Sequence, residues 1–400
     1  MDAAVRSSAT LRRMTGTLAS GSGPSRDARL DLLRGLAIVF VVINHIDQPS
    51  LWHLLTVERV GLVTGAEIFV LLSGVVLGIV HRRRTARAGW TPSVRALLRR
   101  SLTLYLTSVM VVLAVFLLRF LPRLDDQSLT TYTDGPTGRV YDLYAGADHP
   151  GALFRGVALL VYGPGEFNIM GLYVVLLALA PGGLYLLVHG RWPILPALSG
   201  AGFALAHLGV DRLLPSQFEN SFSLLAWQLL FFGGLIVGFH RDHLAVGLSR
   251  RSRRWLVVAA TVLSLGLAVL AWSSPFASVP GPRLPLLTAD RFGEVYAGLF
   301  DRRVLGLGRL VNVIALSVSA YALLSRCQGF LSSRLGRFLV SLGRATLYVF
   351  VVHLVLVLLV DNLASGQYLG LLFGTLVHTV AVLIIGAMVH RRVLFRVIPR

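Results

Sequence analysis

The stretch Arg29-Leu-Asp-Leu-Leu-Arg34-Gly-Leu-Ala-Ile-Val-Phe-Val-Val-Ile-Asn44-His45 decides the fold, because a charged helix start turns into an apolar run that ends on polar side chains. In an α-helix, Arg34 and His45 lie within about 20° of one face and about 16 Å apart along the axis. A cation near one membrane surface and an imidazole near the other, on one stripe, indicate a site that works across a membrane.

The composition predicts a polytopic membrane protein. The chain has 400 residues, of which 55% are hydrophobic and only 14% charged, and its mean hydropathy is +0.71. A soluble globular chain carries roughly 25% charged residues. The net charge of +19 comes from arginines clustered between apolar segments. That pattern is typical of cytoplasmic loops, so we expect the bilayer as a partner and no nucleic acid.

The apolar segments predict an all-α integral membrane protein with about ten transmembrane helices, each close to the ~20 residues that cross the hydrocarbon core. The spans are expected near 30–46, 60–80, 98–121, 169–188, 193–210, 220–240, 254–273, 303–325, 340–361 and 368–390. Ten crossings put the arginine clusters on one side, which places the N and C termini in the cytoplasm.

The predicted domain organisation is a single membrane domain, 29–392, between two tails. Residues 1–28 are rich in Ser, Gly and Arg and are expected to form a disordered cytoplasmic tail, and 393–400 a basic cytoplasmic tail. On the outer face, 151–163 is apolar but too short to span and is expected to be interfacial or re-entrant, and the proline-rich loop 274–302 is expected to cap the same face.

Ionisable residues inside spans are costly, which makes them candidates for function. At ~1.5 Å per residue, His45 lies about 22 Å from the cytoplasmic start of the first span and His353 about 20 Å into the ninth. Glu67 and the pair Trp227-Gln228 lie about 10 Å below the outer ends of their spans. We therefore expect these residues to share one layer in the outer half of the membrane.

Each candidate also has a structural interpretation. Taken alone, Arg34 fits a snorkelling, positive-inside arginine better than a residue that binds a ligand. His45 could face lipid headgroups, and His353 and Gln228 could hydrogen-bond neighbouring helices. Ser73-Gly74, together with Gly78, predicts a close helix-packing surface.

No metal is expected. His45, His353 and Glu67 are one conceivable ligand set, but no HxxxH or HExxH spacing supports it. Cys327 is the only cysteine, which excludes an intramolecular disulfide, an Fe–S cluster and a thiolate zinc site.

Several of these motifs resemble a known family. Arg34-x10-His45 is similar to the R/K-x10-H motif of the acyltransferase-3 membrane acyltransferases, and the sequence looks most like the OpgC branch at 30–37, 44–46, 66–74, 173–181, 226–233 and 342–353. Asn44 departs from the Asp that is common in that branch. An amide can hold a histidine tautomer but cannot stabilise imidazolium as a carboxylate would, so Glu67 is expected to orient His45.

The resemblance implies transfer of an acyl group, succinyl by preference, from cytoplasmic acyl-CoA to a hydroxyl of an envelope or periplasmic glycan, by a protein of the bacterial inner membrane with no bound cofactor. His45 would be the general base or form an acyl-histidine, and Arg34, with Asp31 beside it, would bind the donor, whose arm reaches along the stripe towards His45. The residues expected to contact the acceptor or the carbonyl are Trp227, Gln228, His353, Asn44, Ser73, Glu166 and Asn168. The alternatives are a transporter or flippase of glycans or lipid-linked sugars, and a membrane scaffold without chemistry.

Overall fold

The computed structural model describes residues 27–399 except 134–138, 211, 276–282 and 365–366. The predicted tail 1–28 therefore lies almost wholly outside the described residues. The long helices are α2 (Ala28–His45), α4 (Gly65–Ala88), α5 (Trp90–Leu118), α8 (Ile169–Val188), α9 (Ile194–His207), α10 (Leu224–Phe239), α12 (Arg250–Ala271), α14 (Leu307–Arg326), α17 (Thr346–Ala364) and α18 (Leu371–His390).

Short elements join these helices. They are η1 (Leu51–Leu55), α3 (Val57–Val60), α6 (Gln127–Thr130), β1 (Thr131–Thr133), β2 (Val140–Asp142), α7 (Pro150–Ala158), η2 (Gly165–Phe167), η3 (Gln217–Asn220), α11 (Arg241–Gly247), α13 (Ala289–Leu299), α15 (Gln328–Ser332) and α16 (Arg334–Arg344). Strands β1 and β2 pair antiparallel with Tyr132 opposite Tyr141.

The all-α membrane architecture is confirmed at the level of helices. Each predicted apolar segment contains one long helix, and among the described residues seven helices are long and apolar enough to cross a membrane. They are α4, α5, α8 with the turn before it, α12, α14, α17 and α18. Helices α9 and α10 are shorter, and α2 carries Arg29, Asp31 and Arg34. Ten spans and cytoplasmic termini stay predictions.

Two predicted boundaries are wrong for identifiable reasons. The arginines of 82–100 do not form a loop, because α4 continues to Ala88 and α5 starts at Trp90 with only Gly89 between them, at φ 84°. The positive φ suits glycine and ends α4 in a tight corner. The ninth predicted span is two helices, α16 and α17, separated at Ala345. His353 consequently stands about 10 Å into α17, not about 20 Å into a longer helix.

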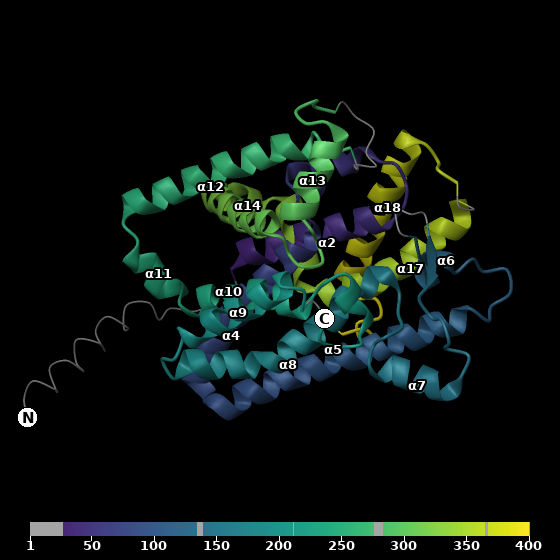
Figure 1. The fold of residues 1–400 in the computed structure, drawn as a ribbon, viewed down its shortest axis with the longest axis horizontal. Coiled ribbons are helices and arrows are strands. Elements are labelled where there is room, and N and C mark those ends of the chain that lie inside the picture. Colours follow the sequence, from purple (N-terminus) through teal and green to yellow (C-terminus); the bar gives the residue numbers. More distant parts are fainter. Residues whose placement is uncertain (1–26, 134–138, 211, 276–282, 365–366, 400) are drawn as a thin grey trace, which may run out of the picture.

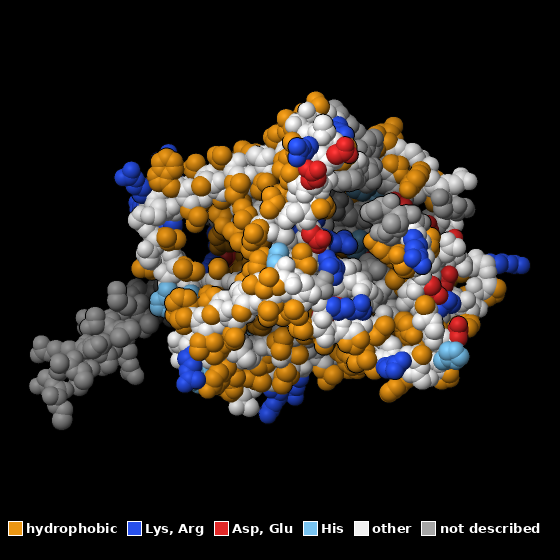
Figure 2. All heavy atoms as spheres, viewed as in Figure 1, with side chains coloured by type: hydrophobic (Ala, Val, Ile, Leu, Met, Phe, Trp, Pro, Cys, Tyr) orange, Lys and Arg blue, Asp and Glu red, His pale blue; other side chains and the backbone are white. Residues whose placement is uncertain are grey.

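Helix α2 lies at the centre of the molecule. It packs against α4, α14, α16, α17 and α18. Figure 1 shows α12 and α14 on one side of it and the pair α5 and α8 on the other. Figure 2 shows hydrophobic side chains covering the outer surfaces of these flanking helices, and α12 exposes Trp255, Leu256, Val262 and Leu265. Such apolar outer faces fit a lipid environment.

The predicted small-residue stripe is a close helix contact. A Cβ on Gly74 would lie 2.1 Å from the carbonyl oxygen of Phe231, and one on Gly78 would lie 2.3 Å from that of Leu235. Gly234 of α10 faces back onto the carbonyl of Leu71 at 2.4 Å. Helices α4 and α10 therefore touch backbone to backbone, which positions the helix that carries Trp227.

We expect Gly234→Ala to destabilise the protein by about 1–3 kcal/mol, because the added methyl group collides with the backbone of α4. Gly233→Ala is the matched control, since a Cβ there meets nothing within 4 Å. Thermal unfolding in detergent compares the two variants. Equal melting temperatures would contradict the close contact.

Candidate functional site

The stripe on α2 packs along α17. An Nη atom of Arg34 donates a hydrogen bond to Oγ1 of Thr346 at 2.9 Å, and Nδ1 of His45 lies 2.9 Å from Nε2 of His353. Both partners lie on α17, seven residues apart, so the two helices run in the same direction at this contact. The polar residues that the sequence placed on one face of α2 therefore share one partner helix.

The two histidines form a directed hydrogen-bond chain. Nδ1 of His353 lies 2.7 Å from the carbonyl oxygen of Phe350, which can only accept, so His353 carries its proton on Nδ1. Nε2 of His353 then accepts from Nδ1–H of His45. His353 is fully buried and His45 is half-buried. The remaining nitrogen of His45, Nε2, has no hydrogen-bond partner among the described residues, and its lone pair is available as a base.

A further histidine, His378 of α18, holds the end of α2. Its Nε2 lies 3.0 Å from the carbonyl oxygen of Ile43 and 3.2 Å from that of Ile46, on either side of His45. It is fully buried and stacks edge-on with His53 at 5.4 Å. His378 was not among the candidates predicted from the sequence. It could have been predicted in the same way as His353, because it too is a histidine in the middle of an apolar span.

The face of α2 between Arg34 and His45 is filled by packing. Ile38, Val41 and Val42 are buried there. The expectation that a donor arm lies along this stripe is therefore wrong for this arrangement of helices, because those side chains occupy the space.

Glu67 does not orient His45. Its carboxylate caps α4, accepting from the backbone N–H of Thr64 at 2.9 Å and from the Thr64 hydroxyl, and it pairs with the guanidinium of Arg309. Arg309 also donates to the carbonyl of Phe300 and to the hydroxyl of Tyr296. The sequence carried a signal for this role, since Thr64-x-x-Glu67 before an apolar run is a capping box.

At the opposite end of α2, the acidic side chains pair with arginines and have a structural role. Asp31 accepts from Nε of Arg344 at 2.9 Å, so it pairs with α16 and not with Arg34. Asp27 caps α2 and accepts from Arg29, Arg241 and the hydroxyl of Tyr321. Burial would raise the pKa of Asp27, but the hydrogen bond and charge of Arg29, with the charge of Arg241, lower it to about 2. This carboxylate stays charged at physiological pH and ties α2 to α14.

Trp227 and Gln228 are both structural hydrogen-bond donors. Nε2 of Gln228 donates to the carbonyl of Ser199 at 2.8 Å, which is the helix-to-helix bond considered as its alternative role. The indole N–H of Trp227 donates to the carbonyl of Arg302 at 3.0 Å. Trp227 thereby fixes the turn before α14.

That turn also carries Arg302. Its side chain is exposed, with the guanidinium 5.6 Å from the centre of the Phe222 ring. Figure 2 shows a hollow on this face of the molecule, between α13 and α17, with basic and histidine side chains at its edge.

The remaining candidates have separate surroundings. Oδ1 of Asn44 and Oε2 of Glu166 are buried and have no hydrogen-bond partner among the described residues. Ser73 accepts from the hydroxyl of Tyr173 at 3.0 Å, which joins α4 to α8. Asn168 lines a crevice of about 20 Å³, room for a water molecule but not for a sugar. Asn44 and Glu166 therefore keep free oxygen atoms, and Ser73 does not.

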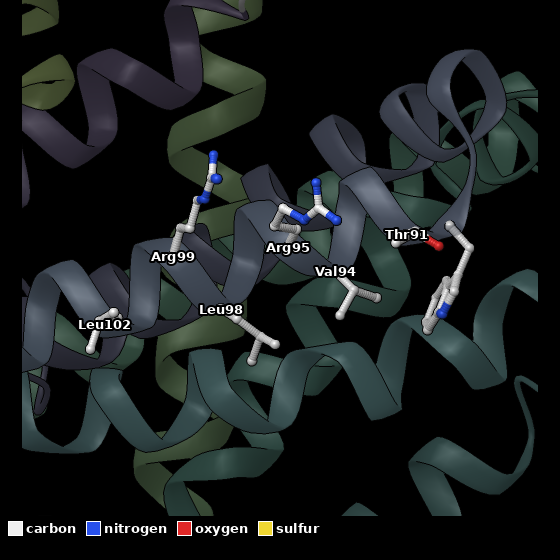
Figure 3. Close-up of a pocket in the computed structure, with 7 residues that line it drawn as sticks. Thr91, Val94, Arg95, Leu98, Arg99 and Leu102 are labelled. Atoms are coloured by element: carbon white, nitrogen blue, oxygen red, sulfur yellow. The ribbon is translucent and has the colours of Figure 1, made fainter.

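A larger groove, about 390 Å³, lies along the first half of α5. Figure 3 shows Arg95 and Arg99 extending from the same side of that helix, with Val94 and Leu98 turned from them. The groove contains none of the predicted site residues, and all the residues that line it belong to α5. Within the described part of the chain, no group of three or more His, Cys, Asp or Glu side chains could hold a metal ion.

Comparison with known proteins gives one match. A family model described as OpgC protein matches residues 26–396. No curated protein and no solved structure matches the chain.

The ion pair of Glu67 and Arg309 is predicted to be a structural unit. Glu67→Gln or Arg309→Gln removes one charge and leaves the other buried without its partner. Either substitution should lower the free energy of unfolding by about 3–5 kcal/mol. The double variant should recover part of this loss, because neither charge is then left alone. A double-mutant cycle on unfolding in detergent measures the coupling, and additive effects would show that the two side chains act independently.

Proposed function

The chain belongs to the OpgC family, and from this membership and the His45–His353 pair we propose that it is a membrane O-acyltransferase. OpgC is an O-succinyltransferase for osmoregulated periplasmic glucans. The proposed reaction moves an acyl group, succinyl by preference, from cytoplasmic acyl-CoA to a hydroxyl of an envelope glycan. The motif Arg34-x10-His45 supports a relation to the wider acyltransferase-3 superfamily.

The observation that carries the proposal is the hydrogen bond from His45 to His353. A general base needs an available lone pair and a partner that fixes its tautomer. His353 supplies the partner, and His45 is half-buried and not sealed in the core. A neutral histidine stabilises imidazolium less than a carboxylate does, so His353 orients the base more than it strengthens it.

In the proposed reaction, Nε2 of His45 removes the proton of a sugar hydroxyl while the oxygen attacks the thioester carbonyl carbon. The tetrahedral intermediate collapses with cleavage of the carbon–sulfur bond, and the departing thiolate of CoA takes the proton from His45. The products are the glycan ester and free CoA. In the acyl-histidine variant, Nε2 attacks the carbonyl carbon first and expels the CoA thiolate. The sugar hydroxyl then attacks the acyl-histidine, takes the acyl group and passes its proton to the thiolate.

Two oxygen atoms are proposed acceptor contacts. Oδ1 of Asn44 stands next to the base in sequence, and Oε2 of Glu166 belongs to η2, which contacts α17. Each can accept a hydrogen bond from a sugar hydroxyl. Trp227, Gln228 and Ser73 support the site by holding helices and the Arg302 turn in place.

We expect His45→Ala to lower the rate of acyl transfer by at least about 100-fold, the usual contribution of a general base. His353→Leu removes one neutral hydrogen bond and should lower the rate less, by about 3- to 10-fold. The measurement is ester formation on a β-glucan oligosaccharide by membranes supplied with succinyl-CoA.

His207→Ala is the matched control, since this exposed histidine only lies against the carbonyl of Phe203 in its own helix. Wild-type rates in His45→Ala would remove the base from the mechanism. Glucan that crosses the membrane unmodified would instead indicate a transporter.

The proposed donor contact of Arg34 has its own test. Arg34→Ala should raise the apparent KM for acyl-CoA about 10-fold or more, because a charge-assisted bond to phosphate is lost. Thr346→Val removes only the hydroxyl that accepts from Arg34, so it should leave KM close to wild type. If both variants lose stability equally and neither changes KM, Arg34 only anchors α2 on α17.

A further inference from the structure

The outward face of α5 carries two arginines next to an apolar stripe. Arg95 and Arg99 are exposed, and neither guanidinium has a hydrogen-bond or ion-pair partner among the described residues. The buried face of the helix lies opposite, where Ser101 donates to the carbonyl of Val174 on α8 at 2.8 Å. Exposed apolar side chains lie within about 60° of Arg95 around the helix axis. They are Leu98, Leu102, Leu106, Met110, Leu113 and Leu117.

The two arginines lie at the level of the lipid headgroups. Helix α5, Trp90–Leu118, is about 43 Å long, whereas the hydrocarbon core is about 30 Å thick. Residues 101–118 contain no charged side chain, so they fill the core and the start of the helix projects from it. Trp90 packs edge-on against Tyr185 at 5.7 Å and His189 at 6.4 Å, an aromatic group typical of a membrane–water interface.

The groove on α5, about 390 Å³, joins the basic and the apolar side chains. Figure 3 shows Arg95 and Arg99 on one side of it and Val94 and Leu98 on the other. The groove therefore has a cationic side at headgroup level and an apolar side that leads towards the core. A phospholipid has the same two parts, a phosphate headgroup and an acyl chain.

The charges around the groove favour an anionic headgroup. The chain has no aspartate or glutamate between Glu67 and Asp125, and Arg82 pairs with Asp242 of α11. The ammonium of phosphatidylethanolamine would therefore meet cations along α5. A headgroup whose only charge is its phosphate meets guanidinium groups, which bind phosphate oxygens in a bidentate way. The arginines of this corner are Arg82, Arg83, Arg84, Arg87, Arg95, Arg99 and Arg100.

We propose that this groove is a binding site for an anionic phospholipid of the phosphatidylglycerol type. Arg95 and Arg99 donate hydrogen bonds to the phosphodiester, and one acyl chain lies along Leu98 and Leu102 towards the hydrocarbon core. The groove contains neither His45 nor His353, so the proposal is independent of the acyltransfer reaction.

The test titrates the purified full chain in dodecyl maltoside with dioleoyl-phosphatidylglycerol or dioleoyl-phosphatidylethanolamine. Native mass spectrometry counts the bound lipid and gives an apparent Kd. Wild type is expected to bind phosphatidylglycerol at least about 10-fold more tightly, because its phosphate pairs with both guanidinium groups and no ammonium is repelled. Equal affinity for the two lipids would overturn the proposal.

A double variant, Arg95→Gln with Arg99→Gln, should weaken phosphatidylglycerol binding by about 10-fold or more and leave phosphatidylethanolamine binding unchanged. Its melting temperature without added lipid should equal that of wild type, because both side chains are exposed. Arg250→Gln with Arg254→Gln is the matched control, an exposed pair at the same spacing in α12 and outside the groove. Equal losses in the two double variants would show diffuse charge attraction only and would overturn the site.

The apolar side of the groove has a separate test. Leu98→Asn keeps the charge and should weaken phosphatidylglycerol binding by about 3-fold or more, because apolar contact with the acyl chain is lost. Glycerol phosphate at the concentration of the lipid should not displace it. Displacement by glycerol phosphate, or unchanged affinity in Leu98→Asn, would show a simple anion site and overturn the assignment to a lipid.

Discussion

The contact between α2 and α17 is the interaction on which the candidate site depends. One helix supplies Arg34 and His45 and the other supplies Thr346 and His353, so His45 has its partner only where these helices are in register. A shift of one turn along either axis, about 5.4 Å, would separate the two rings. His378 adds a second support by holding the carbonyls of Ile43 and Ile46. The position of His45 is thus determined by helix packing as much as by its place in the sequence.

The charged groups around this contact have two different roles. Asp27, Asp31 and Glu67 each pair with arginines from other helices, and these pairs join α2 and α4 to the elements around them. Charges that face a low-dielectric interior are costly unless they are paired, which explains why these carboxylates are satisfied. His45 has no carboxylate partner among the described residues and is bonded to the ring of His353, so it is not one of the groups that hold the helices by charge.

Close helix packing positions the rest of the site. The glycines of α4 and α10 allow their backbones to touch, and α10 in turn carries Trp227, which fixes the Arg302 turn. A chain of contacts therefore runs from a small-residue stripe, through an indole, to the turn that carries Arg302.

The sequence by itself determined the helical membrane class, the apolar segments, the small-residue stripe and the common face of Arg34 and His45. These depend on composition and on a local period of 3.6 residues, both of which are visible along the chain. The sequence did not reveal the break between α16 and α17 at Ala345. Glu67 was expected to orient His45, because the capping box that it forms with Thr64 at the start of α4 was not considered. Only the tertiary structure decided that His353 is the partner of His45, because these two residues are hundreds of positions apart and helix packing alone brings them together.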